Sequence, residues 1–181
     1  MKTGAQPSPL ARRDPGRAGS FLARLLRAGL LCATIDGIWA VVLTLYYQRT
    51  VLQLFQGIAA TVFGAEMFNG GVPSALVGLA LHVGVAFAWS AVFLAFAESS
   101  PWLRRMLATR SGVAAVAAVY GPLIWIVMST VVIPLLPHRP AAVSPRWFVQ
   151  LVGHFVFVGL PIAGSIGRDE SRQDAGPVTD L

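Results

Sequence analysis

The chain has 181 residues, of which 55% are hydrophobic and only 12% are charged. An ordinary soluble domain carries about 25% charged residues, so the polar residues here are too few to cover the surface of a water-soluble globule. This composition argues against a soluble enzyme, a nucleic-acid-binding protein or a secreted disulfide scaffold, and it predicts an integral membrane protein.

The formal net charge of +6 is concentrated ahead of the first apolar run. Six of the fourteen basic residues lie there: Lys2, Arg12, Arg13, Arg17, Arg24 and Arg27. This is the place of a positive-inside signal, and the apolar remainder offers no basic groove for nucleic acid. The single cysteine, Cys32, excludes an intramolecular disulfide. No cleavage site of small residues closes the first run, which we therefore predict to be a retained span.

The distribution of apolar and polar residues along the chain predicts a single membrane domain, residues 21–167, between two polar ends. Residues 1–20 are predicted to be a disordered basic arm, and residues 168–181 a disordered tail. A helix needs ~20 residues to cross ~30 Å of hydrocarbon. The apolar runs that meet this length predict four transmembrane helices, at 28–47, 73–97, 112–136 and 146–166.

A shorter apolar segment, residues 51–63, lies between the first two spans. Gln53, Gln56 and Thr61 alternate with apolar residues at helical spacing. This length cannot cross a bilayer, so the segment predicts an amphipathic helix on the outer side, either interfacial or re-entrant.

The distribution of Lys and Arg predicts the orientation of the bundle. Eleven of these residues lie in the N-terminal arm, the 98–111 connection and the C-terminal tail, against three in the other connections (Arg49, Arg139 and Arg146). The positive-inside rule then places both termini in the cytoplasm. The fold class predicted is an all-α, four-helix transmembrane bundle.

The second and fourth spans share a pattern that predicts a tandem repeat of helical hairpins, 28–97 and 112–166. Each contains a proline followed nine residues later by a histidine, Pro73 with His82 and Pro145 with His154. The predicted helix at 51–63 would be an insertion in the first hairpin.

A few polar residues fall at membrane depth and form the candidate site. Asp36 lies nine residues beyond Arg27, ~13 Å along a helix. His82 and His154 lie equally deep from the opposite side, so the three side chains are predicted to meet near the bilayer midplane. Gln150, one turn from His154, and Tyr120 on the third span complete the predicted polar cluster.

Three interpretations of this cluster are open. It forms a buried hydrogen-bond network that fixes helix register; or His82 and His154 are axial ligands of a b-type haem; or Asp36 and a histidine exchange a proton on a path for protons or small solutes. A zinc or iron centre of the two histidines and Asp36 matches no ligand motif.

One further carboxylate, Glu66, lies on the predicted outer side, where it is a candidate for a periplasmic entrance. The chain contains no Gly-x-Ser-x-Gly, no His-Glu-x-x-His and no phosphate-binding glycine loop, which argues against an enzyme.

Three segments resemble a known family: Gln56–Ala59 ahead of Gly64, Leu79–His82, and the run from His154 to Ala163. They are similar to small four-span bacterial inner-membrane proteins of the YagU-like kind, over about residues 25–167. The resemblance implies a multi-pass protein of the bacterial cytoplasmic membrane. It carries no assigned chemistry, so no catalytic residue is transferred.

The function predicted is that of an inner-membrane protein without a catalytic site. It is either an accessory subunit of a larger membrane complex or a path for protons or small solutes; the alternative is a haem-binding redox protein. Lipid is the expected partner, and self-association through small-residue helix faces is expected as well.

Overall fold

The computed structural model describes the backbone of residues 15–136 and 143–174, and side chains within 20–136 and 143–168. The described residues form helices and connecting turns, without a strand. In chain order the helices are α1 (Pro15–Tyr46), α2 (Val51–Phe63), η2 (Ala65–Asn69), α3 (Gly71–Ser99), α4 (Pro101–Leu107), α5 (Arg110–Val127), η3 (Met128–Val132), α6 (Ile133–Leu135), α7 (Pro145–His154), η4 (Phe155–Gly159) and α8 (Leu160–Asp174).

Four helical stretches within the described residues are long and apolar enough to cross a membrane. They are Ser20–Tyr46, Gly71–Ser99, Arg110–Leu135 and Pro145–Arg168. The third stretch joins α5, η3 and α6, and the fourth joins α7, η4 and most of α8. The predicted all-α bundle of four spans is therefore confirmed, and so is a separate helix between the first two spans, α2.

The first span begins earlier than predicted, because the segment that carries Arg24 and Arg27 is itself helical. Long arginine stems can lie along an apolar helix while the guanidinium groups reach polar surroundings. Helix α1 starts at Pro15, inside the predicted arm of residues 1–20, since proline suits the first turn of a helix. Helix α8 continues to Asp174, inside the predicted tail. The remainder of both predicted ends lies outside the described residues.

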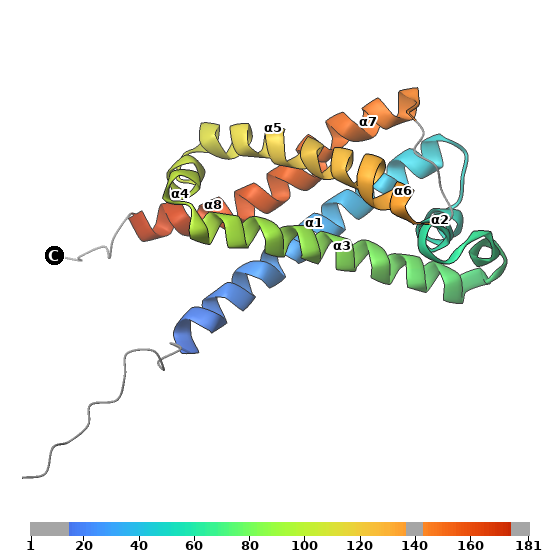
Figure 1. Ribbon diagram of the computed structural model, residues 1–181, viewed down its shortest axis with the longest axis horizontal. Helices are drawn as coiled ribbons and strands as arrows, with labels where there is room; N and C mark the ends of the chain where they lie inside the picture. The colour runs from blue at the N-terminus through green and yellow to red at the C-terminus, as the bar shows by residue number, and fades with distance from the viewer. Residues whose placement is uncertain (1–14, 137–142, 175–181) are drawn as a thin grey trace, which may run out of the picture.

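Successive spans run in opposite directions along the bundle (Figure 1). Helix α4, the start of α5 and the end of α8 lie together at one end, which we call the α4 end. Helix α2, the start of α3 and the start of α7 lie at the other, the α2 end. Helix α1 packs against both α3 and α8. The described chain therefore begins and ends at the α4 end.

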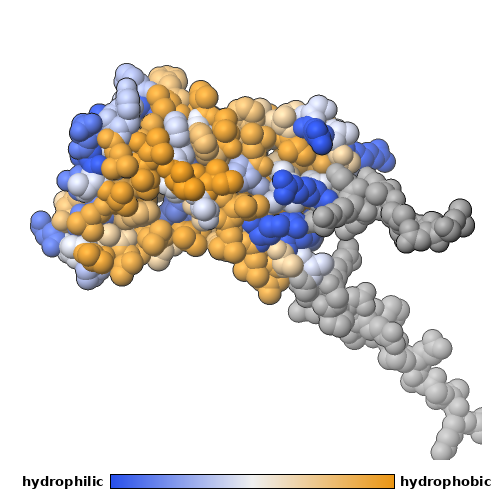
Figure 2. Space-filling model, turned by 180° about the vertical axis from the view of Figure 1, so that it is seen from behind, coloured by the Kyte–Doolittle hydropathy of each residue, from blue (hydrophilic) through white to orange (hydrophobic). Residues whose placement is uncertain are grey.

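The surface between the two ends is apolar. Figure 2 shows hydrophobic residues over most of the visible face, with hydrophilic residues gathered towards both ends. Large apolar side chains such as Leu30, Ile38 and Val119 point outward and are 56%, 60% and 69% exposed. Burying such side chains in lipid removes them from water, which is the arrangement that a membrane-spanning bundle requires.

The interior of the α4 half is filled by small and branched apolar residues. Ala28, Ala117 and Ala163 are fully buried, and Leu94 and Ile162 fill the space among them. Small residues at the contacts let helix backbones approach closely, which favours packing of helices in a membrane.

Helix α2 turns its small and polar residues toward α3. Thr50 and Gln53 form a capping box at its first turn, and the buried Gln56 donates from Nε2 to the carbonyl of Gly71 at 3.1 Å. Leu52 and Phe63 are exposed instead. Because the exposed face of α2 is apolar, this helix is suited to contact lipid rather than water.

Two wide π turns interrupt the third and fourth spans. The turn η3 ends two residues before Pro134, and η4 ends two residues before Pro161. Proline lacks a backbone donor and crowds the carbonyl four residues earlier. A π turn placed just before each proline relieves that crowding and keeps the span continuous.

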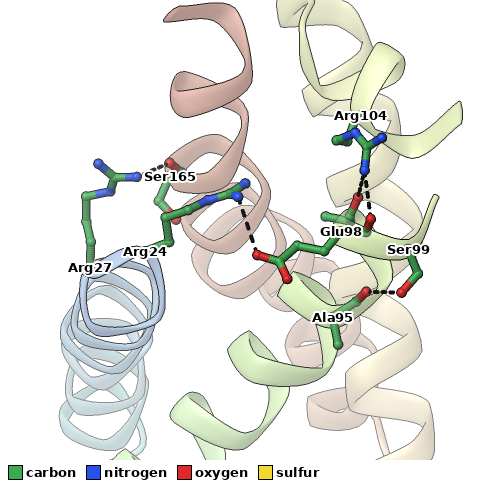
Figure 3. A network of polar contacts seen from close by, with 8 residues as sticks. Arg24, Arg27, Ala95, Glu98, Ser99, Arg104 and Ser165 are labelled. Carbon is green, nitrogen blue, oxygen red and sulfur yellow. Dashed lines mark hydrogen bonds and ion pairs between the residues drawn. The ribbon is translucent and has the colours of Figure 1, made fainter. Parts of the chain in front are cut away.

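A polar network ties four helices together at the α4 end (Figure 3). Arg24 of α1 pairs with Glu98 of α3 at 3.7 Å. Arg27 donates to the backbone carbonyl of Ser165 in α8 at 2.9 Å. Arg104 of α4 donates to the carbonyl of Glu98 at 2.7 Å. Together with the apolar core, these contacts link α1, α3, α4 and α8 at the α4 end.

Candidate functional site: a cavity between the spans

The structure brings four of the five residues of the predicted polar cluster into one cavity of about 270 Å³. Asp36 reaches it from α1, His82 from α3, and Gln150 and His154 from α7. The rest of the wall is mostly apolar and aromatic. The cavity lies deep in the bundle because each of these side chains sits well inside a membrane-spanning helix.

The first contact of the site joins His82 to α1. Its Nε2 lies 3.0 Å from the carbonyl oxygen of Ala33. A carbonyl can only accept, so Nε2 carries the proton and donates. Gly37 leaves room for this ring, because a Cβ there would lie 3.3 Å from Nε2.

The second contact places two acceptors face to face. With the proton on Nε2, the Nδ1 atom of neutral His82 is an acceptor, and it lies 3.9 Å from Oδ2 of Asp36. Two acceptors at this separation repel each other unless a proton resides on one of them. A proton shared by Asp36 and His82 would turn this contact into an attractive one.

His154 is oriented within its own helix. Its Nδ1 donates to the carbonyl of Gln150 at 2.7 Å, which leaves Nε2 as the acceptor nitrogen. The imidazole ring packs against Trp125, with ring centroids 4.8 Å apart. The carboxylate of Asp36 lies within electrostatic range of both His82 and His154.

Gln150 is fixed by an aromatic neighbour on α1. Trp39 donates from Nε1 to Oε1 of Gln150 at 3.3 Å, and its ring stacks on Phe157 at 4.5 Å. The absence of a side chain at Gly153 leaves space for the indole ring of Trp39, since a Cβ there would lie 2.5 Å from Trp39 Nε1. The Gln150 amide group is therefore held at the cavity wall.

Trp125, which is not part of the predicted polar cluster, adds a donor to the site. Its Nε1 is buried and has no hydrogen-bond partner within the described part of the chain, and the residue lines the cavity. A mid-span tryptophan looks like packing in a sequence, so only its proximity to His154 reveals this contribution.

Tyr120, the fifth predicted residue, does not line the cavity. Its hydroxyl donates to the backbone carbonyl of Trp89 at 2.7 Å, and its ring packs on Phe93 with centroids 4.7 Å apart. Tyr120 thereby bridges α5 to α3. It faces a separate apolar groove of about 480 Å³ towards the α4 end.

Glu66 lies apart from the cavity. It is an exposed residue of η2 at the α2 end, and it is not among the residues that line the cavity. The structure does not bring the predicted entrance residue to the predicted polar cluster.

The haem hypothesis requires one free nitrogen on each of His82 and His154. Nε2 of His82 donates to the carbonyl of Ala33, and its Nδ1 faces Asp36, so ligation through Nε2 would break the hydrogen bond to α1 and ligation through Nδ1 would displace Asp36. The positions of these two histidine side chains therefore do not support the haem hypothesis. For a zinc or iron centre of the two histidines and Asp36, the described residues contain no group of three or more His, Cys, Asp or Glu side chains placed to hold a metal ion.

A smaller hollow of about 180 Å³ adjoins the cavity at the α2 end. We call it the vestibule. Its polar lining consists of Thr44, Tyr47, Arg49, Arg146 and Gln150. Ala40, Leu54 and Gln150 line both hollows, so the vestibule and the cavity share a wall.

No protein-family model matches the chain, and neither curated proteins nor solved structures show a significant similarity to it. The fold and the apolar surface between the two ends define a multi-pass membrane protein with four helical spans.

Proposed function

We propose that the protein forms a path for protons or small solutes across the bacterial inner membrane. The observation that carries this proposal is the Asp36–His82 pair, whose facing acceptors lie 3.9 Å apart inside a cavity that also contains His154. An ionisable group at membrane depth costs a few kcal/mol to insert and commonly marks a proton or ion pathway.

The bundle supports access to this pair from the α2 end. The vestibule adjoins the cavity there, and its arginines are exposed. At the α4 end the apolar core and the Arg24–Glu98 network close the bundle. Transport would then require the α4 half to open, as in other proteins that expose a central site to each side in turn.

The charge distribution supports an orientation for this path. By the positive-inside rule the α4 end, which carries most of the arginines, faces the cytoplasm. The cavity would be reached from the outer side. The resemblance to YagU-like proteins supports the bacterial cytoplasmic membrane as the location.

The test replaces a single carboxylate by its amide. Asp36→Asn keeps the shape of the side chain but removes the carboxyl group that can bind and release a proton. In vesicles containing the purified protein and a trapped pH-sensitive dye, we expect an imposed membrane potential to drive a proton flux that Asp36→Asn reduces by about tenfold or more, because proton-carrying groups act directly in the flux.

Glu66→Gln is the matched control, since it makes the same chemical change at an exposed carboxyl away from the cavity. This variant should retain the flux. Equal flux in wild type and Asp36→Asn, with both proteins helical and monodisperse, would contradict the proposal.

A second candidate function, an accessory subunit, is favoured by the apolar groove across α3, α4 and α5. Phe96, Trp102 and Val119 line it and are more than 60% exposed. Exposed apolar area of this kind is suited to a neighbouring helix or to a second copy of the chain. Extraction in mild detergent should then recover a stoichiometric partner or a dimer, whereas a monodisperse monomer would argue against this role.

A further inference from the structure

We infer that the vestibule is a binding site for a small organic carboxylate. This inference rests on the proposed solute path and names the class of solute that the path would take. It is carried by two guanidinium groups at the rim, by an amide held at the inner wall, and by the apolar character of the cavity behind them.

The turn after α1 positions the first guanidinium group. Gln48 adopts a left-handed conformation with φ 58°, and the backbone N–H of Arg49 donates to the carbonyl of Thr44 at 3.0 Å. The chain therefore folds back over the last turn of α1, and Arg49 lines the vestibule instead of continuing away from it.

An aromatic ring holds the second guanidinium group. The Cζ atom of Arg146, in the first turn of α7, lies 3.8 Å from the centre of the Tyr47 ring. Stacking on an aromatic face restricts the guanidinium but leaves its edge N–H groups available. That edge matches the two oxygens of a carboxylate, so Arg146 is suited to bidentate recognition.

The charge balance of the vestibule favours an anion. Among its described lining residues, Arg49 and Arg146 are the charged side chains, and no carboxylate lies with them. Two positive charges at an entrance attract anions and repel metal and ammonium cations, whereas a proton can be relayed between polar side chains and does not have to enter as a free cation. A metal cation or an amine would therefore be disfavoured at this point of the path.

The cavity behind the vestibule suggests what the anion carries. An anion at the arginines would meet the Gln150 amide, which lines both hollows. Beyond it the wall includes apolar residues such as Ile58 and Val158, with the buried Trp125 N–H among them. A carboxylate head with a short apolar body fits this order better than a fully polar ion such as inorganic phosphate.

The experiment titrates sodium propionate into the full-length protein in phosphatidylcholine nanodiscs, at constant ionic strength. Tryptophan fluorescence is the signal, because Trp39 contacts Gln150. We expect a saturable change, with a Kd that rises about tenfold or more in the double variant Arg49→Gln/Arg146→Gln, since charge-assisted hydrogen bonds are lost.

Two controls and one graded variant test this result. Arg105→Gln removes an exposed arginine at the α4 end and should leave the Kd unchanged. Propylamine, a cation of matched size, should produce no saturable change. Arg146→Lys keeps the charge without the planar edge, so it should bind propionate more weakly than wild type and more tightly than Arg146→Gln.

The inference is overturned if propionate gives no saturable change, or if the double variant binds it as tightly as wild type. It is also overturned if the two arginines retain phosphatidylglycerol from mixed nanodiscs while propionate does not bind, because the site would then hold a lipid headgroup. Asp36-dependent proton flux without propionate binding defeats this inference alone. Arginine-dependent propionate binding, with a flux indifferent to Asp36→Asn, defeats the proton path and leaves the site standing.

Discussion

Replacing Gly78 by alanine should detach α2 from the start of α3. A Cβ at this position would overlap the backbone carbonyl oxygen of Phe55. A backbone atom cannot rotate away as the end of a side chain can, so the two helices must separate. We expect the free energy of unfolding to fall by about 3 kcal/mol, the upper part of the range for overpacked interiors.

The measurement is thermal unfolding in detergent, combined with limited proteolysis of the chain around α2. Gly84→Ala is the control in the same helix, because a Cβ at Gly84 meets nothing within 4 Å. That variant should be as stable as wild type or more stable by about 0.5 kcal/mol, since alanine favours a helix over glycine. Equal unfolding temperatures for the two variants would show that α2 does not pack on α3 as described.

Gly121→Ala should damage stability and the candidate site together. Its Cβ would overlap the carbonyl oxygen of His154, at the junction of α7 and η4. Relief requires α5 to move away from that junction, which displaces the imidazole from Asp36 and Trp125. We expect a loss of about 3 kcal/mol in the free energy of unfolding, and a lower proton flux even below the unfolding temperature.

Gly164→Ala serves as its comparison in the fourth span. A Cβ there would lie 3.9 Å from Val113 Cγ1, an ordinary van der Waals distance. Its unfolding temperature and its proton flux should match those of wild type. A Gly121→Ala protein that melts and conducts like Gly164→Ala would contradict the close approach of α5 to the fourth span.

The fold could be predicted largely because the bilayer leaves few choices. Apolar runs of sufficient length must be helical to satisfy their backbone groups in lipid, and polar connections separate them clearly in this chain. The meeting of Asp36, His82 and His154 in one cavity also followed from arithmetic, since helical rise converts residue number into depth. Depth alone placed these side chains at one level.

Rotation about the helix axis was harder to predict than depth. Tyr120 has the depth of the cluster but turns towards Phe93, because an aromatic ring packs well there and its hydroxyl finds the Trp89 carbonyl. The apolar residues of α2 were expected to define its amphipathic character, but the side buried against α3 is the one with Gln56. In lipid the usual rule that apolar residues face the interior no longer decides orientation.

The vestibule was beyond prediction for a different reason. Arg49 and Arg146 are ninety-seven residues apart in the chain, and both serve equally well as topology signals. Only the left-handed turn at Gln48 and the stacking on Tyr47 bring them to one hollow. Such contacts depend on the assembled bundle and leave no spacing in the sequence.

Because of the π turn η4, the fourth span lines the cavity with its first part and the core of the α4 half with its second part. Each residue of an α-helix advances by ~100° around the axis, so the extra residue of a π turn rotates everything after it by about that angle relative to an unbroken helix. Before the turn, Gln150 and His154 face the cavity; after it, Ile162 and Ile166 are fully buried in the core of the α4 half. If the turn reverted to α-helix, the part of the span after it would rotate by about 100° relative to the part before it. Gln150 and His154 could then stay at the cavity only if Ile162 and Ile166 turned out of the core.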